Sequence, residues 1–393
     1  MQQNSRMAQI TLLLLAALTP MSTVIIASAL PILDDFFQLA PQSVTWVISL
    51  FIFGIVMGMI FYAPLANRFG RVNTLKIGLL ISLIGLLLCV ISFFTQHFPT
   101  LLAGRWITAI GSCAANVCVT LLIVELYPLN KARQMAAYIT LSATIAGSLG
   151  ITIGSYLTVY FHWVSCFFLM IGLTCFIYVM LRSLPETLTT SDRQSIQVAK
   201  LLKGYVNVLK EPLTRTAITV MGAYCVFNYL YSGVTPILAI DNLKLSIEAY
   251  GTWHIMNFVG IILGSLLSAY LANRMEVIQL IKRALILGIV CSVLLLFYRI
   301  VSLNQPFFFF LLTSLLFFSS MLFYPNMSTY AVSKSKDRAS ASSMTKVVSF
   351  SIGLISLVIL GILPIELFYQ FTVIVVVVHV IGYLLLCFYK PSA

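Results

Sequence analysis

Long apolar runs, separated by short polar breaks, make up most of this chain. Runs such as 8–30, 74–94 and 163–181 are long enough to cross a bilayer as an α-helix, which takes about 20 residues. Cutting the sequence at its polar breaks predicts twelve transmembrane helices: 8–30, 43–66, 74–94, 98–124, 134–158, 163–182, 215–238, 249–272, 281–301, 306–330, 341–363 and 367–389. The first run is too long for the apolar part of a signal peptide, and we expect it to remain as a helix.

One long polar stretch, residues 183–214, interrupts the series and leaves six predicted helices on each side. We therefore expect an N-terminal six-helix bundle at 1–182, a cytoplasmic linker at 183–214 and a C-terminal six-helix bundle at 215–393. Within the linker, residues 194–210 place apolar side chains at helical spacing among lysines. This pattern fits an amphipathic helix on the inner membrane surface, or a solvated connector.

The two halves of the chain resemble each other. Two glycines and the sequence Leu-Ala-Asn-Arg within residues 54–68 recur 206 residues later, within 260–274. The sequence Pro-Ile-Leu at 31–33 recurs 205 residues later, at 236–238. Each match falls on the same helix number in its half. Transporters are often built from such repeats, with the substrate site between them near the bilayer midplane. The predicted fold is therefore all-α, with two pseudo-symmetric six-helix bundles.

Charged residues are few and unevenly placed. They make up 9% of the 393 residues, against about 25% in soluble domains, and the formal net charge is +12. With the N-terminus inside, nineteen of the 23 lysines and arginines fall on inward segments. This positive-inside pattern predicts a multi-pass inner-membrane protein with both termini in the cytoplasm. It also accounts for the basic balance without a nucleic-acid partner.

The sequence predicts no metal or cofactor. All eight cysteines fall within predicted helices and none forms a CxxC pair, so we expect small packing residues rather than disulfides or metal ligands. An integral membrane enzyme should show clustered acid–base or ligand residues at membrane depth, and a receptor should have a sizeable soluble domain. Neither pattern is present, which leaves both classes as remote alternatives.

Polar residues inside the apolar spans are the candidates for substrate or ion binding, because they are costly in lipid and usually face a cavity or a partner. Arg105 lies near the outer end of the fourth span and Lys346 near the inner end of the eleventh, so each can also snorkel to an interface. The uncharged candidates, which can equally bond one helix to another, are Asn116, Asn228, His254, Asn257 and Asn326.

Twelve spans, a central linker and the loop after the second span resemble the major facilitator superfamily along the whole chain. The loop signature of that family reads roughly G-x-L-a-D-r-x-G-r-[rk], and residues 63–72 read APLANRFGRV. The form Pro-Leu-x-x-Arg-Phe-Gly-Arg resembles the drug:proton antiporter branch, of the bicyclomycin- and chloramphenicol-resistance type. Residues that keep the pattern are Pro64, Leu65, Arg68, Gly70 and Arg71, and those that depart from it are Ala63, Asn67 and Val72.

This resemblance implies a latch on the cytoplasmic side. In the family, an acid and arginines of this loop form charge-assisted bonds, which are stronger than neutral ones, and hold one conformation closed. Asn67 is uncharged where the family has the acid. The alternative is that these charges only set the topology. The latch candidates are Asn67, Arg68, Gly70 and Arg71, with Glu125 at the inner end of the fourth span and Arg133 in the next loop.

The fourth and fifth spans carry partial matches to two further family motifs. The signature R-x-x-q-G-x-g corresponds to Arg105–Gly111, and the resemblance ties Arg105 to proton coupling. The antiporter motif G-P-x-x-G-G corresponds to 150–155, where two glycines remain and the proline is lost. Small residues at this spacing also let helices approach closely. We expect that packing role for Gly147, Gly150 and Gly154.

No aspartate or glutamate lies in the middle of a predicted span, and Ser22 or Thr23 stands where the family usually has an acid in the first one. A cationic drug in a dry cavity and a proton carrier both normally need such a carboxylate. His254 can titrate near neutral pH and replace it as proton carrier. Basic residues without an interior carboxylate favour a cavity of positive potential and an anionic or zwitterionic solute.

We therefore expect a secondary transporter that moves a small organic molecule by alternating access, with proton-linked efflux as the leading function. Its partners would be the substrate, protons and the lipid bilayer, and we expect a monomer. The open alternative is transport of an organic anion, such as a carboxylate-rich metabolite or siderophore, in either direction. Exchange of two solutes, or uniport, would need no proton carrier.

Overall fold

The computed structural model describes residues 2–39, 43–127, 129–188, 206–271, 274–301, 305–335, 338–360 and 366–388. All the secondary structure within those ranges is helical. Eleven helical segments there are long and apolar enough to span a membrane, and the shorter apolar helix Met344–Leu360 makes a twelfth. The twelve segments coincide with the twelve predicted spans, and the all-α membrane fold is confirmed.

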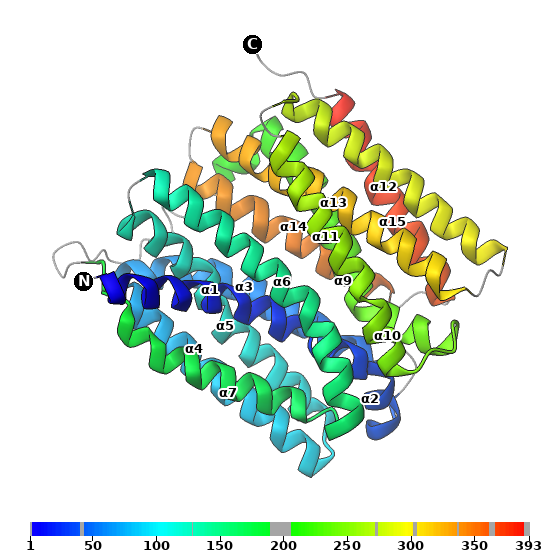
Figure 1. Cartoon of the computed structure of the whole chain (residues 1–393), viewed down its shortest axis with the longest axis horizontal. Coiled ribbons are helices and arrows are strands. Elements are labelled where there is room, and N and C mark those ends of the chain that lie inside the picture. Colours follow the sequence, from blue (N-terminus) through cyan, green and yellow to red (C-terminus); the bar gives the residue numbers. More distant parts are fainter. Residues whose placement is uncertain are drawn as a thin grey trace. The chain divides into compact units, whose positions relative to one another are not determined.

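The chain forms two compact units, Met1–Val198 and Ala199–Ala393. In Figure 1 the helices of unit 1 run from blue to green, and those of unit 2 from yellow-green to red. The predicted linker contains the boundary between the units. Its residues 189–205, which include most of the stretch 194–210, lie outside the described residues.

The described residues of unit 1 form six membrane segments, of which the first is broken. That segment consists of α1 (Gln2–Val24), the short turn η1 (Ala27–Ala29) and α2 (Leu30–Phe37). Pro31 stands in the first turn of α2, where its missing N–H leaves no bond unmade. The other segments are η2 (Ser43–Thr45) with α3 (Trp46–Phe69), α4 (Arg71–Thr95), α5 (Phe98–Leu126), α6 (Leu129–Phe161), and α7 (Ser165–Met180) with η3 (Leu181–Ser183).

Helix α5 is the packing centre of unit 1, with α1, α3 and α4 around it. Glycines allow the close approach of α4 and α5: a Cβ on Gly104 would lie 2.8 Å from the carbonyl oxygen of Gly85. Lipid supplies no hydrophobic force between helices, so close backbone packing contributes much of their association. The resulting fixed position of α5 sets the location of Arg105 near one end and Glu125 near the other.

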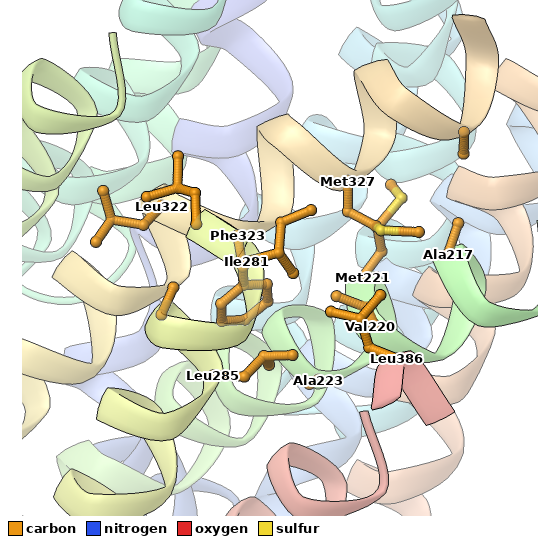
Figure 2. Close-up of a cluster of buried hydrophobic side chains, with 13 residues drawn as sticks. Ala217, Val220, Met221, Ala223, Ile281, Leu285, Leu322, Phe323, Met327 and Leu386 are labelled. Carbon is orange, nitrogen blue, oxygen red and sulfur yellow. The ribbon is translucent and has the colours of Figure 1, made fainter. Parts of the chain in front are cut away.

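In unit 2, too, the described residues form six membrane segments, the second of which consists of two helices that meet at His254. The segments are α9 (Pro212–Asp241), α10 (Ile247–Trp253) with α11 (Ile255–Leu271), α12 (Val277–Ile300), α13 (Pro306–Lys334), α14 (Arg338–Leu360) and α15 (Leu367–Phe388). Apolar side chains from α9, α12, α13 and α15 meet in a buried cluster (Figure 2), to which Ile281, Phe323 and Leu386 belong. Helix α13 contacts α9, α11 and α12, as α5 contacts α1, α3 and α4.

The repeat in the sequence corresponds to one helix contact made in both units. A Cβ on Gly58 of α3 would lie 2.8 Å from the Cβ of Cys113 on α5. A Cβ on the equivalent Gly264 of α11 would lie 2.6 Å from the carbonyl oxygen of Phe318 on α13. The repeated glycines therefore serve close packing of the second and fourth membrane segments in each unit.

Candidate functional site

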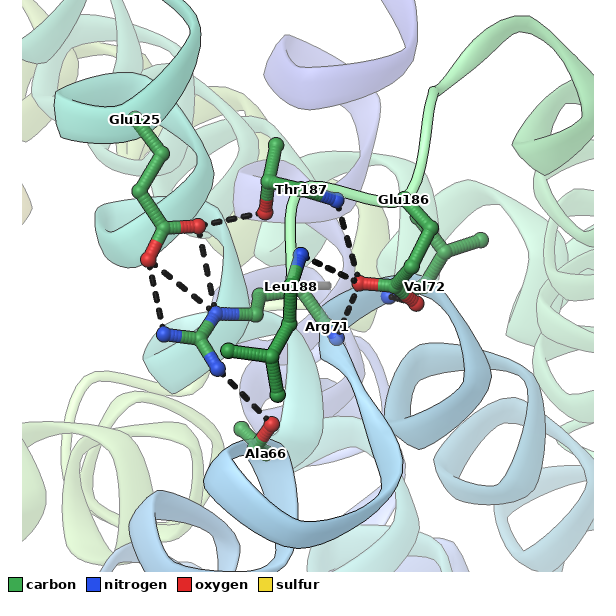
Figure 3. Close-up of polar contacts among 7 residues, drawn as sticks. All are labelled: Ala66, Arg71, Val72, Glu125, Glu186, Thr187 and Leu188. Atoms are coloured by element: carbon green, nitrogen blue, oxygen red, sulfur yellow. Dashed lines mark hydrogen bonds and ion pairs between the residues drawn. The ribbon is translucent and has the colours of Figure 1, made fainter. Parts of the chain in front are cut away.

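A dense polar cluster surrounds the turn between α3 and α4 (Figure 3). It consists of Arg71, Glu125, Glu186 and Thr187 and is called the loop cluster below. Arg71 is 6% exposed and donates from Nε to both carboxylate oxygens of Glu125, each at 3.1 Å. Its Nη2 donates to the same carboxylate at 2.7 Å, and its Nη1 donates to the carbonyl of Ala66 at 2.9 Å. One guanidinium therefore joins the ends of α3, α4 and α5.

Glu186, which follows α7, caps the beginning of α4. Its carboxylate accepts the backbone N–H groups of Arg71 at 2.8 Å, Val72 at 3.1 Å and Asn73 at 3.4 Å. The first N–H groups of a helix have no partner inside the helix, and a negative charge there is favourable. The hydroxyl of Thr187 donates to Glu125, so the segment after α7 is bonded to both α4 and α5.

Gly70 is required at this turn for two reasons. Its φ of +97° is a conformation that other residues rarely adopt. A Cβ at this position would also lie 2.5 Å from Oε2 of Glu186. The glycine of the motif therefore makes room for the carboxylate that caps the next helix.

The structure brings together only part of the predicted latch set. Gly70, Arg71 and Glu125 meet in the loop cluster, whereas Arg68 is exposed with its guanidinium 5.4 Å from the Phe69 ring. Asn67 is half-buried on α3 and takes no part in the bonds of the cluster. Arg133 lies on α6, and its side chain is outside the described residues.

Glu186 and Thr187 were missed by the sequence reasoning. The available signal was a carboxylate placed directly after the sixth span, on the same membrane side as the second-to-third loop. It was passed over because residues 183–214 were interpreted as a linker. The anion next to the α3–α4 turn is therefore Glu186, while Asn67 occupies the usual acid position of the motif.

Arg105 forms a second polar centre, inside unit 1. It is 1% exposed and donates to the carbonyl oxygens of Ser22 at 2.7 Å, Thr23 at 3.0 Å and Val47 at 3.3 Å. Its guanidinium carbon lies 4.0 Å from the centre of the Phe51 ring. The side chain does not snorkel to an interface.

The break in the first membrane segment explains the partners of Arg105. Because α1 ends at Val24, carbonyls of its last turn can lack N–H partners from a continuing helix; Met21 still accepts from Ile25, whereas Arg105 donates to Ser22 and Thr23. The guanidinium, with five N–H donors, supplies charge-assisted bonds to two of these carbonyls. The fourth-span arginine therefore caps the broken helix at the position where Ser22 and Thr23 replace the usual acid.

Helix α6 presses against the same break through its glycines, and Figure 1 shows α1 and α6 side by side. A Cβ on Gly154 would overlap the carbonyl oxygen of Ile25. A Cβ on Gly150 would lie 3.0 Å from Val24, and one on Gly147 would lie 3.5 Å from Pro20. The α6 glycines thus lie along the end of α1.

A shallow, largely open cleft of about 460 Å³ also runs between α1 and α6. Its lining is almost entirely apolar, with one phenol and one hydroxyl, and its volume is within the range of about 300–1,000 Å³ typical of sites for drug-sized ligands. The lining includes Leu13, Ala17, Met21, Tyr138, Ser142 and Ile145.

Unit 2 contains a buried polar chain of four side chains from α9, the α10–α11 break and α13. The Tyr231 hydroxyl lies 3.0 Å from Nδ1 of His254 and 2.6 Å from Nδ2 of Asn257. The hydroxyl of Thr313 lies 2.9 Å from Oδ1 of Asn257. Two of these residues, His254 and Asn257, were predicted candidates. Tyr231 and Thr313 were not, because tyrosine and threonine are ordinary in apolar spans.

The remaining predicted residues are dispersed. Asn326 on α13 donates to the hydroxyl of Ser268 on α11 at 2.8 Å, which is a bond between helices. Asn116 on α5, Asn228 on α9 and Lys346 on α14 are half-buried and take no part in the chain of four.

The buried polar side chains of the described residues are mostly hydroxyl groups, with a few amides, histidines and arginines. Among the described residues, no buried side chain is an aspartate or a glutamate. No group of three histidine, cysteine or acidic side chains in those ranges lies close enough to hold a metal ion, and the cysteines are free thiols.

Comparison with curated proteins identifies transporters as relatives. The chain is 26% identical to an uncharacterized transporter of Rickettsia bellii over 289 residues, which cover 72% of this chain and 69% of the relative. It is 22% identical to a bicyclomycin resistance protein homolog of Haemophilus influenzae, over 72% of this chain and 71% of the relative. It is 26% identical to the quinolone resistance protein NorB of Staphylococcus aureus, over 59% of this chain and 47% of the relative.

Among solved structures, the chain resembles a D-xylose-proton symporter with a TM-score of 0.78 and 12% identity, over 96% of this chain and 97% of the other. An identity this low shows the fold alone. The model of the Major Facilitator Superfamily matches residues 12–388. The chain therefore belongs to the major facilitator superfamily, and it is a multi-pass membrane transporter of small molecules rather than an enzyme.

Proposed function

We propose that this transporter exports a small organic, drug-like molecule in exchange for protons, by alternating access of its two units. It would act in the inner membrane as a monomer with both termini in the cytoplasm. The observation that carries the proposal is the broken first segment of unit 1, capped by Arg105. In transporters, discontinuous helices typically form the substrate and coupling-ion sites near the bilayer midplane.

The cleft between α1 and α6 supports an organic solute with a large apolar part. It lies beside the broken helix, it has a drug-sized volume, and its lining is nearly all apolar. Two relatives are named for resistance to bicyclomycin and to quinolones. The buried arginine, with no buried carboxylate among the described residues, favours a neutral or zwitterionic solute over a lipophilic cation.

The loop cluster is suited to serve as a latch of one conformation. Its bonds join α3, α4, α5 and the segment after α7 through one arginine and two carboxylates. Charge-assisted bonds of this kind are strong but can be exchanged for water when the segments separate. We infer that the cluster forms when the cytoplasmic side is closed and opens when unit 1 changes shape.

Transport of an organic anion is the second candidate. Anion transport is favoured by a positive electrostatic potential in the membrane interior, which Arg105, Lys346 and the shortage of interior carboxylates would produce. The three carbonyl contacts of Arg105 count against it, because they occupy three of the five N–H groups that would pair with a substrate carboxylate.

Proteoliposomes with a trapped pH indicator would test the proposal. An imposed gradient of norfloxacin, a zwitterionic quinolone, should drive counter-movement of protons, with ethidium as the cationic probe and citrate as the anionic one. A response to citrate alone would favour the anion transporter. Norfloxacin movement without any pH change would replace antiport by uniport or exchange, and a response confined to ethidium would contradict the predicted charge preference.

A further inference from the structure

The four side chains Thr313, Asn257, Tyr231 and His254 are linked by hydrogen bonds in the interior of unit 2. Nδ2 of Asn257 also lies 3.1 Å from Nδ1 of His254, so these two residues contact each other directly as well as through Tyr231. All four residues are buried, and His254 is 2% exposed. Buried polar networks are normally satisfied throughout. Here one end is open, because Nε2 of His254 is buried and has no hydrogen-bond partner among the residues that the structure describes.

The hydrogen bonds of the series can be arranged in two ways, and in the first way each residue donates to the next one toward His254. The Thr313 hydroxyl donates to Oδ1 of Asn257, Nδ2 of Asn257 donates to the Tyr231 oxygen, and the Tyr231 hydroxyl donates to Nδ1 of His254. A nitrogen that accepts a hydrogen bond carries no proton. In this state the imidazole is therefore neutral, and its one N–H is on Nε2.

The same positions allow the opposite direction. If Nδ1 gains a proton, it donates to the Tyr231 oxygen, and the Tyr231 hydroxyl turns toward Asn257. A half-turn of the Asn257 amide then lets its oxygen accept from Tyr231 and its nitrogen donate to Thr313. Thr313 ends the series by donating to the carbonyl of Phe310, 3.2 Å away.

No hydrogen bond is lost in this reversal, and apart from the half-turn of one amide no heavy atom has to move. The 2.6 Å separation of Tyr231 and Asn257 is short for an N–H···O bond and ordinary for an O–H···O bond. The carbonyl of Phe310 makes the reversal possible, because the Thr313 hydroxyl can donate to it when Asn257 no longer accepts.

We propose that His254, with Tyr231, Asn257 and Thr313 as its reversible hydrogen-bond chain, binds and releases the transported proton in place of a mid-membrane carboxylate. This inference rests on the proposed proton-linked transport. The proton enters from water on one side of the membrane, adds to Nδ1 to give an imidazolium with two N–H groups, and leaves Nδ1 to water on the other side.

The described residues around His254 carry no charge that could stabilise its protonated form, so protonation requires that water or the solute reaches the ring. The titratable groups that face its ring are the phenols of Tyr231 on α9 and Tyr250 on α10, both uncharged at neutral pH. The described residues of α11 and α13 near it add Asn257, Thr313 and aromatic rings, and no charge. An imidazolium buried without a counter-ion is costly. The proton is therefore held only while Nε2–H reaches water or an acceptor atom of the solute.

The position of His254 in the fold supplies the moving part. It is the single residue between α10 and α11, and a small rotation there would let water reach both nitrogens of its ring. Its backbone remains bonded on both sides, since its N–H donates to Tyr250 at 2.9 Å and its carbonyl accepts from Asn257 at 2.9 Å. A second buried histidine, His379, sits within the continuous helix α15 with Nδ1 2.8 Å from the carbonyl of Val375, and it has no reversible series beside it.

The test has two arms, and the first needs no substrate. The protein is labelled with ¹⁵N-histidine, placed in nanodiscs and titrated from pH 5 to 8, with the four histidine signals assigned by single His→Gln substitutions. We expect the His254 signals to pass from imidazolium to the Nε2–H tautomer as pH rises, while His379 keeps one neutral tautomer. Asn257→Asp, which presents an acceptor to Nδ1 in every orientation, should move the His254 transition to higher pH. Tyr231→Phe should weaken the preference for the Nε2–H tautomer, because Nδ2 of Asn257 is then the remaining donor near Nδ1.

The second arm measures norfloxacin-driven proton movement in proteoliposomes. His254→Gln should lose it and keep downhill norfloxacin movement, and His379→Gln should keep both. A His254 that stays neutral from pH 5 to 8, or a His254→Gln protein that still moves protons with norfloxacin, would overturn the proton site. If wild-type protein moves no protons with any probe while His254 titrates as described, the proposed antiport fails and the proton-binding site stands.

Discussion

At the scale of single residues, the break in the first membrane segment is determined by two side-chain choices on neighbouring helices. Arg105 bonds the carbonyls that the end of α1 leaves free, and Gly154 leaves the space that the Ile25 carbonyl fills. An arginine without carbonyl partners would be an unpaired buried charge, and a larger residue at 154 would push the two helices apart. The break therefore needs both residues.

Replacing Gly154 by alanine should destabilise the protein by about 1–3 kcal/mol, because the added methyl group overlaps backbone atoms of α1. The measurement is the thermal unfolding of purified protein in detergent. Gly172→Ala is the matched control, since that glycine lies in the helix α7 with nothing within 4 Å of the added Cβ. Equal unfolding temperatures for the two variants would contradict the packing role of Gly154.

At the scale of elements, the loop cluster connects helix ends that are far apart in the sequence. Arg71 begins α4, Glu125 lies in the last turn of α5, and Glu186 follows α7. A carboxylate at a helix N-terminus contributes about 0.3–1 kcal/mol when exposed and up to about 2 kcal/mol when partly buried. The cluster is therefore strong enough to bias a conformational equilibrium and weak enough to be broken in each transport cycle.

Arg71→Ala should impair norfloxacin transport in proteoliposomes while the protein still inserts into the membrane in normal amount, because the ends of α3, α4 and α5 lose their common partner. Glu186→Ala should act in the same direction, since the beginning of α4 loses its cap. Arg68→Ala is the control, as Arg68 belongs to the same loop but is exposed and outside the cluster. Unchanged transport by the Arg71 variant would remove the latch from the mechanism.

At the scale of the whole molecule, the charge distribution predicts the orientation in the membrane. The inward loops of the predicted topology carry nineteen of the 23 basic residues, and such an excess keeps a loop in the cytoplasm. We expect a fluorescent protein fused after residue 393 to fold and fluoresce, as it does in the cytoplasm. Alkaline phosphatase fused after Asn304, in a predicted outward loop, should be active. The reverse pair of results would invert the topology and place the loop cluster on the outer side.

The sequence identified some members of each polar centre and missed the others for a physical reason. Arg105 was conspicuous as a charge in an apolar span. Its partners are backbone carbonyls, which every residue has, so the sequence does not reveal which of them accept its hydrogen bonds. Glu186 lies 61 residues beyond Glu125 in the chain, and only the packing of α7 beside α4 places it at the start of that helix. His254 and Asn257 are three residues apart and were readable together, whereas Tyr231 and Thr313 come from other helices.

The sequence by itself determined the twelve membrane segments, the repeat and the superfamily, because the length and apolarity of a span and the small residues at close helix contacts are local properties of the chain. The tertiary structure alone decided which polar groups meet. In a bilayer the backbone donors and acceptors must be satisfied inside the protein, and the partner of a group that its own helix leaves free is set by how the helices pack. The capping of α1 by Arg105, the carboxylate cap on α4 and the reversible chain that ends at His254 therefore became visible only once the helices were in place.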